Sequence, residues 1–304
     1  MAALLARRKA SGSYRGRRPT RRFARRSRYT VKRRTYRKRP YRRMTRKSIL
    51  NATSRKKRDT MILQTNVSTT TPVGNPTYNK GPAPITGQAF YVWCATARDL
   101  TQPNNVVNSI VDEAGRTATT CYMRGLKEKI TFSTNDATPW LWRRIVFYSK
   151  NPFMRTSTSG AGNTFAPYQE NSAGFARVVN QPVVGGTYDD VIWKGQIGVD
   201  WDDFMTAPVD TRRLDLQSDK TVTIAPGAQG GVYKSFTRWH PINKNLVYDD
   251  EENGPIEATS VFSVLDKRGC GDMYVIDIFK PGAGLQSTSV LYFKPEATLY
   301  WHEK

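Results

Sequence analysis

The side chains with the clearest chemical role lie near the start of the chain, where Arg and Lys alternate with aromatic rings. Residues 1–58 hold 25 of the 48 basic residues and no carboxylate, because the first acidic residue is Asp59. Five aromatic residues interrupt the basic run at intervals of five to nine positions, namely Tyr14, Phe23, Tyr29, Tyr36 and Tyr41. Guanidinium groups bind phosphates, and rings stack on unpaired bases at about 1–3 kcal/mol per base with little sequence preference. The pattern predicts a nucleic-acid-binding segment.

The residues expected to contact nucleic acid lie between positions 17 and 43. They are Arg17, Arg18, Arg21, Arg22, Arg25, Arg26, Arg28, Tyr29, Lys32, Arg33, Arg34, Tyr36, Arg37, Lys38, Arg39, Tyr41, Arg42 and Arg43. Short Lys/Arg-rich stretches also serve as nuclear import signals. Two such stretches are Arg37, Lys38, Arg39 and Arg55, Lys56, Lys57, Arg58. A solvated tail is the plainer interpretation of the same composition.

The charge divides the chain into two predicted domains, residues 1–58 and residues 59–304. The second part contains 23 basic and 25 acidic residues, so it is close to neutral. In the first part, like charges repel and little aliphatic surface offsets the entropy of ordering the backbone, so we expect a disordered arm that needs a polyanionic partner. Arg suits this role because its planar guanidinium binds phosphate with two donors and also stacks.

The remaining sequence offers little for catalysis or metal binding. The only two histidines, His240 and His302, are about sixty positions apart, and the three cysteines form no CxxC pair. The acidic clusters at 200–203 and 249–252 lack the spacing of an EF-hand, and we expect them to be solvated loops or partners of Lys and Arg. No phosphate-binding loop or nucleophile elbow occurs. We therefore predict no enzyme, no cofactor and no bound metal, and we expect the cysteines to be buried thiols.

The second part reads as a series of β-strands. Short segments rich in β-branched and aromatic residues are separated by Pro, Gly, Asn and Asp. The predicted strands are 89–96, 124–134, 140–150, 190–199, 212–224, 233–239, 273–280 and 297–303. The segment MYVIDIF is apolar on both faces, which indicates a central strand between two layers.

Three further local predictions concern residues 59–304. In residues 212–224, Leu214 and Leu216 alternate with polar residues, and the alternation resumes at Val222 after a Ser-Asp pair, which predicts a hairpin. Residues 104–115 are the only segment with helical spacing, since Val106, Val107, Ile110 and Val111 are followed by Gly115. Residues 151–189 are rich in Gly, Ser, Asn and Pro and predict a long irregular connection.

About eight strands with long connections favour an all-β fold, a two-sheet β-sandwich or jelly roll, over a propeller or small barrel. We expect one folded domain, because residues 59–304 contain no linker-like stretch or internal repeat. The apolar opening MAALLA is too short for the core of a signal peptide, and no apolar run approaches 18 residues, so no membrane segment is expected.

This plan resembles the coat proteins of small icosahedral viruses. More specifically, ILNATSRKKRDTM (49–61) is similar to the arm-to-body junction of genomovirus capsid proteins, whose relatives are the geminivirus coat proteins. The order of later segments is also similar: FYVWCATARDLT, LKEKITF, WLWRRIVFYSKNP, KSFTRWHPINKNLVYDDEENG, MYVIDIF and LYWHEK. The junction is the most specific part of the resemblance, because the strands match in character more than in letters.

The resemblance implies an eight-stranded viral jelly roll that self-assembles into an icosahedral (T=1) shell of about 60 copies. It also implies a packaged circular single-stranded DNA genome, assembly in the host nucleus after recognition by nuclear import receptors, and a final location in the virion. A zinc-binding Cys/His motif has been linked to geminivirus coat proteins, but this chain has no matching cluster. About 60 arms of charge +25 would bring roughly 1,500 positive charges to a genome, so counterion release would drive packaging.

Two other classes of protein share parts of this pattern. A cellular nucleic-acid-binding protein, ribosomal or chromatin-associated, would share the arm but would need no self-association. An enzyme tethered to nucleic acid by its arm would need a catalytic site, and the sequence shows none.

Overall fold

The fold comes from a computed structural model, in which residues 44–70, 74–158, 164–182, 187–227 and 230–304 are described. The chain divides into two compact units, residues 1–45 and Arg46–Lys304. The predicted disordered arm lies outside the described residues up to position 43, so the account below concerns the second unit.

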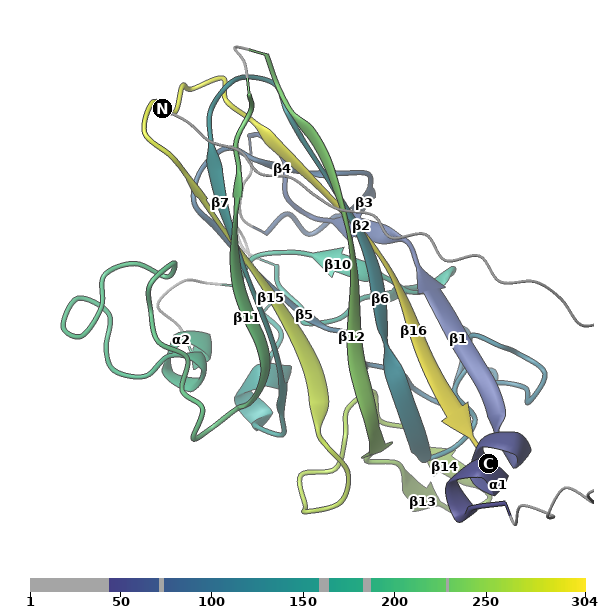
Figure 1. Ribbon diagram of the computed structural model, residues 1–304. Helices are drawn as coiled ribbons and strands as arrows, with labels where there is room; N and C mark the ends of the chain where they lie inside the picture. Colours follow the sequence, from purple (N-terminus) through teal and green to yellow (C-terminus); the bar gives the residue numbers. More distant parts are fainter. Residues whose placement is uncertain (1–43, 71–73, 159–163, 183–186, 228–229) are drawn as a thin grey trace, which may run out of the picture. The chain divides into compact units, whose positions relative to one another are not determined.

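Two antiparallel sheets form this unit (Figure 1). The strands of sheet I are β1 (Arg55–Met61), β4 (Ala83–Ile85), β6 (Thr120–Thr134), β12 (Tyr233–Val247) and β16 (Leu291–Glu303). The strands of sheet II are β5 (Ala89–Cys94), β7 (Trp140–Ser149), β11 (Asp215–Ile224) and β15 (Asp272–Pro281). Sheet I has the order β1-β16-β6-β12, with β4 also paired to β16, and sheet II has the order β11-β7-β15-β5.

The other elements are short. They are α1 (Arg46–Thr53), β2 (Leu63–Thr65), β3 (Asn79–Lys80), the 3₁₀ helix η1 (Pro152–Arg155), β8 (Glu170–Asn171), β9 (Gly174–Phe175), β10 (Arg177–Val179), α2 (Thr187–Ile192), β13 (Glu251–Asn253) and β14 (Ile256–Ala258). The small sheet β10-β2-β3 contains a parallel pair, β10 with β2. The described unit is thus mainly antiparallel β-structure with few helices.

Side-chain alternation along the long strands produces the core between the two sheets. In β6, Leu126, Ile130 and Phe132 are buried, while Lys127 and Lys129 are exposed. Successive side chains of a strand point to opposite faces, so sheet I has one buried face and one face toward solvent. Two apolar clusters fill the space between the sheets, one around Trp93 and Trp301 and the other around Phe132 and Phe293.

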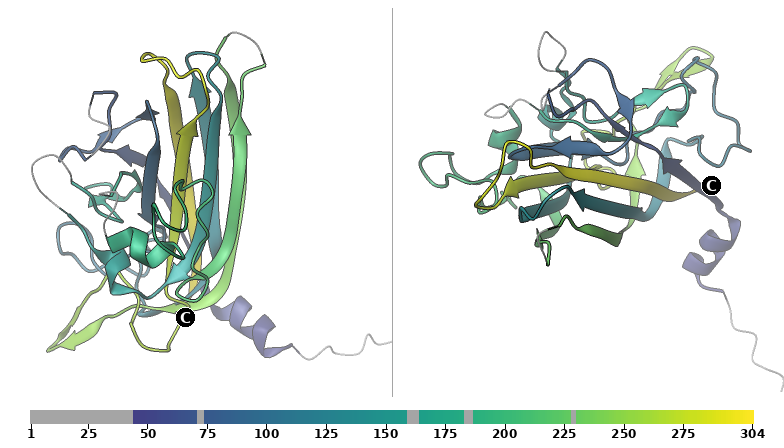
Figure 2. Two further views of the ribbon diagram at one scale, coloured as in Figure 1. Left: turned by 90° about the vertical axis from the view of Figure 1, so that its left-hand side faces the viewer. Right: turned by 90° about the horizontal axis from the view of Figure 1, so that it is seen from above.

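Sheet II is covered on both faces. In β15, Val275 faces sheet I, whereas Ile276 and Ile278 belong to a third cluster on the far side. Residues of the connection between β7 and β11 close this third cluster, including Ile192 of α2 and Trp193. Figures 1 and 2 show α2 and the loops around it beside sheet II. The prediction that MYVIDIF is a central strand is confirmed, because burial on both faces explains its continuous apolar sequence.

Seven of the eight predicted strands correspond to β5, β6, β7, β11, β12, β15 and β16. The eighth prediction, a strand at 190–199, is wrong. Asp189 and Asp190 lie in the first turn of α2, where carboxylates stabilise a helix, and the chain then turns at Gly195 and Gly198, which have positive φ. Val191, Ile192 and Trp193 cover sheet II instead of joining it, while Ile197 and Val199 are exposed.

The helix predicted at 104–115 is absent, and turns with a bridge between Thr101 and Val107 take its place. Asn104 accepts a hydrogen bond from the Val106 backbone, and the Asn108 amide donates to the carbonyls of Asp99 and Arg116. Asn side chains compete with the backbone for hydrogen bonds and favour turns over helix. The valines at helical spacing are exposed.

The hairpin predicted at 212–224 is also wrong. Residues Asp215–Ile224 form one strand, β11, whose pairing with β7 shifts in register between Leu216 and Ser218. A β-bulge adds one residue to one strand and moves the alternation by one position. The break in the apolar pattern therefore marks a bulge and not a turn.

The folded unit begins at Arg46, 12 positions before the predicted boundary at residue 58. Residues 46–53 form α1, and Arg55–Met61 pair with β16 from Glu303 to Ala297. Residues 46–53 and 55–58 therefore have regular structure within the stretch that was expected to be disordered, and carboxylates of Glu303 and Glu113 compensate Lys57 and Arg58.

Candidate nucleic-acid interface

All the residues predicted to bind nucleic acid, Arg17 to Arg43, lie outside the described residues, and so do Arg37, Lys38 and Arg39 of the predicted import signal. Their assignments stay predictions. The second basic stretch, residues 55–58, lies in β1 and can be placed.

Lys57 is buried beneath the edge of sheet I, while its neighbours Arg55, Lys56 and Arg58 are exposed. The Lys57 ammonium donates to the Asp112 carbonyl at 3.0 Å and lies 3.5 Å from a Glu303 carboxylate oxygen. Arg58 instead forms an exposed pair with Glu113 at 3.3 Å. Lys57 is thus inaccessible to an import receptor while β1 is paired, and the remaining predicted import residues keep their assignment as a prediction.

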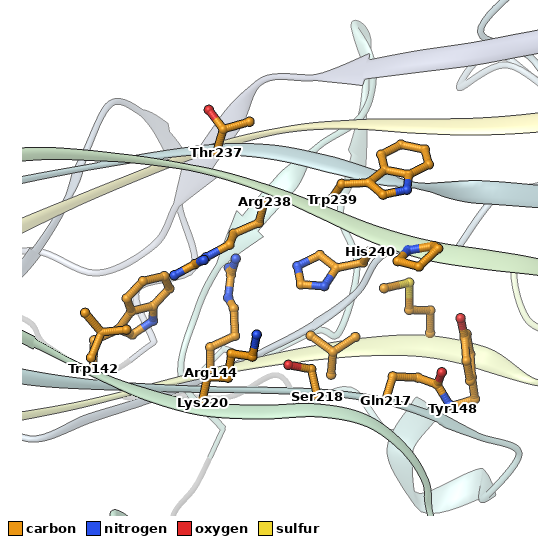
Figure 3. Close-up of a pocket in the computed structure, with 14 residues that line it drawn as sticks. Trp142, Arg144, Tyr148, Gln217, Ser218, Lys220, Thr237, Arg238, Trp239 and His240 are labelled. Atoms are coloured by element: carbon orange, nitrogen blue, oxygen red, sulfur yellow. The ribbon is translucent and has the colours of Figure 1, made fainter. Parts of the chain in front are cut away.

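A groove of about 410 Å³ opens between β11 of sheet II and β12 of sheet I, the end strands on one side of the sandwich (Figure 3). The two strands belong to different sheets and leave this side of the sandwich open. Because β12 alternates between faces, Arg238 and His240 point into the groove, and Trp239 points to the other side of the strand. From β11, Ser218 and Lys220 line the opposite wall.

The floor of the groove covers a buried network of four charges between the sheets. Arg144 of β7 donates to Glu128 at 2.7 Å and to Asp277 at 2.8 Å. Arg177 donates to the same two carboxylates, at 3.2 Å and 2.8 Å, and its guanidinium lies 4.3 Å from the centre of the Trp93 ring. Two cations and two anions balance, which is the condition under which charges are tolerated in a core.

The carboxyl of Glu128 is held in its charged form. Burial by itself would raise the pKa of Glu128, but the charges of Arg144 and Arg177, together with the nearby His240 ring, outweigh burial and hold the pKa well below its ordinary value. His240 Nε2 lies 3.5 Å from a Glu128 oxygen, so the ring connects the network to the groove.

Above this balanced network, the walls of the groove are basic. Among the described residues, no carboxylate pairs with Lys220 or Arg238, and the Arg238 guanidinium lies 5.4 Å from the centre of the Phe236 ring. The groove can therefore attract an anion.

The candidate metal-ligating side chains of the described residues are not gathered into a metal site. The described residues contain no group of three or more His, Cys, Asp or Glu side chains that could hold a metal ion. The acidic clusters take part in ion pairs within the unit, since Asp250 binds Arg116 at 2.6 Å and Asp203 binds Lys280 at 2.5 Å. Cys94, Cys121 and Cys270 are free thiols, as predicted, although Cys270 is only partly buried.

The buried network was not predicted, although the sequence contains a signal for it. Glu128, Arg144 and Asp277 each interrupt a strand whose other inward residues are apolar. A charged residue at a core position predicts a buried partner of opposite charge. Arg177 had no such context, because it lies in the irregular connection between β7 and β11.

Within the described part of the chain, no helix has the length and apolar character needed to cross a bilayer. No protein-family model matches this chain, and no curated protein matches its sequence.

Proposed function

We propose that this chain is the structural coat protein of a small virus similar to the genomoviruses. In this proposal the folded unit assembles into an icosahedral shell of about 60 copies, and the basic arm binds a circular single-stranded DNA genome inside the shell. The observation that carries the proposal is the unequal distribution of charge between the arm and the folded unit.

The unit boundary moves six basic residues from the arm to the folded unit, so the charge contrast becomes smaller but persists. Residues 1–45 hold 19 of the 48 basic residues and no acid, which leaves 29 basic against 25 acidic residues in Arg46–Lys304, a net charge of +4. About 60 such arms would bring roughly 1,100 positive charges to an enclosed polyanion, enough to neutralise much of a genome of about a few thousand nucleotides. A strongly charged segment on a nearly neutral body can bind nucleic acid without preventing the bodies from packing together.

The strand order supports a jelly roll as the finer description of the sandwich. Eight strands make up the two main sheets apart from β4, and in chain order they are β1, β5, β6, β7, β11, β12, β15 and β16. The first pairs with the last in sheet I, and the second pairs with the seventh in sheet II. Two four-stranded sheets formed by such nested pairs are typical of the jelly rolls used in viral capsids.

Nuclear import and assembly in the host nucleus belong to the same proposal, and the virion is the final location. The candidate import residues are Arg37, Lys38, Arg39, Arg55, Lys56 and Arg58. They depend on the resemblance and on the basic stretches and have no support from the described contacts.

The proposal is tested by assembly of the purified full chain with circular single-stranded DNA. Sedimentation and electron microscopy should show closed particles of megadalton mass that protect the DNA from nuclease. Deletion of residues 1–45 should abolish DNA retention and leave the far-ultraviolet circular dichroism of the β-structure unchanged. DNA retention by the full chain should also fall steeply as salt rises, because phosphate neutralisation releases counterions.

A matched pair of arm variants tests whether DNA retention depends on the positive charge of the arm or on the Arg side chains themselves. Replacing every Arg of residues 1–45 by Lys keeps the charge, so DNA should still be retained at low salt, whereas replacement by Gln should abolish retention. A full chain that stays monomeric at high concentration in the presence of DNA would refute the shell. It would favour the alternative of a cellular nucleic-acid-binding protein without shell assembly.

A further inference from the structure

An exposed tryptophan on the outer face of sheet I has no evident role in the fold. The side chain of Trp239, on the end strand β12, is 49% exposed, and it points away from the groove and the core (Figure 3). An indole loses favourable burial when half of it faces water, and exposed aromatic residues are typical of binding surfaces. The neighbouring residues indicate what this indole could bind.

The indole packs over Gly125 on the outer surface of the sheet, and its plane is tilted by 58° from the ring of Tyr300. A Cβ atom at Gly125 of β6 would lie 2.6 Å from one indole carbon of Trp239 and 2.8 Å from the next, so glycine provides the space on which the ring lies. On the other side of Gly125, Tyr300 of β16 presents a second ring, with 5.8 Å between the two ring centres. Trp239, Gly125 and Tyr300 thus form a fixed aromatic surface, here called the aromatic platform.

Cations surround the aromatic platform. By register, Lys127 lies directly opposite Trp239, and Arg58 lies directly opposite Tyr300. Lys129 is next on β6, and among the described residues neither Lys127 nor Lys129 forms an ion pair, although Glu296 lies opposite Lys129 by register. Glu296 is 3.4 Å from Lys294, and Arg58 forms an exposed pair with Glu113 that a phosphate would replace.

We propose that the aromatic platform stacks an unpaired base of single-stranded DNA, while Lys127 and Arg58 contact the flanking phosphates. An exposed indole face between cations matches a single strand, whose bases are free to stack, and does not match a duplex, whose bases are already stacked. The basic arm is repelled by the same cations and is excluded as the occupant.

The position of β1 favours the same ligand. The chain enters the folded unit through α1 and β1, and β1 is the end strand of the sheet that carries the aromatic platform. DNA bound by the preceding residues would therefore be at high effective concentration near this face. This inference deepens the proposed function and rests on it, because it adds a contact on the body to the contact made by the arm.

Photocrosslinking locates the contact. The full chain is irradiated with a single-stranded oligonucleotide of about 20 nucleotides that contains 5-bromodeoxyuridine, and crosslinked peptides are identified by mass spectrometry. Peptides containing Trp239 or Tyr300 should carry crosslinks in addition to peptides from residues 1–45. A duplex of the same length and composition should crosslink to the arm alone.

Affinity variants test the energy of the contact. At about 0.5 M salt, where phosphate contacts are weakened, Trp239→Ala should reduce affinity for the single strand about fivefold or more, and Trp239→Phe should retain most of it. Tyr233→Ala is the matched control, because Tyr233 is an exposed residue on the same strand, 75% exposed, and lies away from the platform. It should leave the affinity within about twofold.

The outcomes separate this inference from the proposed function. Crosslinks confined to residues 1–45, with unchanged affinity for Trp239→Ala, would overturn the aromatic platform and leave the arm proposal intact. Absence of any DNA binding by the full chain would overturn both. Loss of particle assembly in Trp239→Ala with unaltered crosslinks would also overturn it, because the face would then be a contact between copies of the chain.

Discussion

Replacement of Glu128 by Gln tests whether the buried charge network stabilises the sandwich. Gln has the same size and shape as Glu, so packing is preserved, but the variant leaves Arg144 and Arg177 with Asp277 as the only carboxylate of the network. Both guanidinium groups donate to Glu128, at 2.7 Å and 3.2 Å, and its side chain is completely buried. The change therefore creates an uncompensated positive charge between the two sheets.

The expected loss follows from this geometry. Removing one partner of a buried ion pair costs about 3–5 kcal/mol of unfolding free energy. For a folded unit of this size, 1 kcal/mol corresponds to about 2–4 °C in melting temperature, so the loss should be roughly 6–20 °C. Urea titration and thermal melts of wild type and variant, at equal protein concentration, measure both quantities.

Glu296→Gln is the matched control, since it makes the same substitution in the same sheet on the exposed face. Glu296 forms only a surface pair with Lys294, so its replacement should change stability by about 0.5 kcal/mol or less. Arg177→Met added to Glu128→Gln restores charge balance and should recover part of the loss. Equal small losses for the two Glu variants, or no recovery in the double variant, would refute the role assigned to the network.

The network also predicts an acid dependence. Because the pKa of Glu128 is lower in the folded state than in the unfolded state, its contribution is complete above about pH 4.5 and is lost as pH falls toward the folded value. The stability difference between wild type and Glu128→Gln should therefore shrink as pH falls below about 4.5. A difference that is constant from pH 7 to the acid limit would contradict this.

Three further measurements address other buried groups. Lys57→Met should lower the unfolding free energy by about 2 kcal/mol or more in urea titrations, because it leaves the buried Glu303 without its cation. Arg58→Met is the control at an exposed position and should change the unfolding free energy by about 0.5 kcal/mol or less. Burial raises the pKa of Asp272 to about 6, so the carboxyl contributes stability that is complete below about pH 4 and is lost as pH rises through 6. The difference in unfolding free energy between wild type and Asp272→Asn should therefore fall between about pH 4 and 6. A difference that stays flat over this range would contradict the assignment. A thiol reagent at neutral pH should label at most Cys270 in the native protein and all three cysteines in denaturant, because the other two are buried; rapid native labelling of more than one thiol would show that the core opens.

Strands that obey simple alternation or continuous burial could be predicted from the sequence. The segment at 273–280 is apolar on both faces because loops cover sheet II, and the segment at 124–134 alternates because sheet I has one face toward water. Both patterns record burial directly, which explains why these elements were found. The pairing of β1 with β16 left no such pattern, since β1 reads RKKRDTM and resembles the basic arm before it.

Predictions failed where a local side chain or a tertiary contact outweighed periodicity. Asn104 and Asn108 bind backbone groups and prevent a helix at 104–115, although the valines have helical spacing. A bulge in β11 imitates a turn. Arg177 illustrates the second cause, because its partners Glu128 and Asp277 are 49 and 100 positions away and are brought to it only by the fold.

The two sheets differ in what covers their outer faces: loops cover sheet II, whereas the outer face of sheet I is open to solvent. Sheet II is closed by aromatic and aliphatic residues from the connection between β7 and β11, so its far face is as dry as the core. On sheet I the residues in the same position are Lys127, Lys129, Trp239 and Tyr300, which are too polar to form a second core and too aromatic for a purely solvated face. Such a mixture is stable in water and still gains from a ligand that offers both phosphates and flat bases. The proposed contact with single-stranded DNA therefore falls on the face that the fold leaves uncovered, and β1, the first strand of the folded unit, lies at the edge of that same sheet.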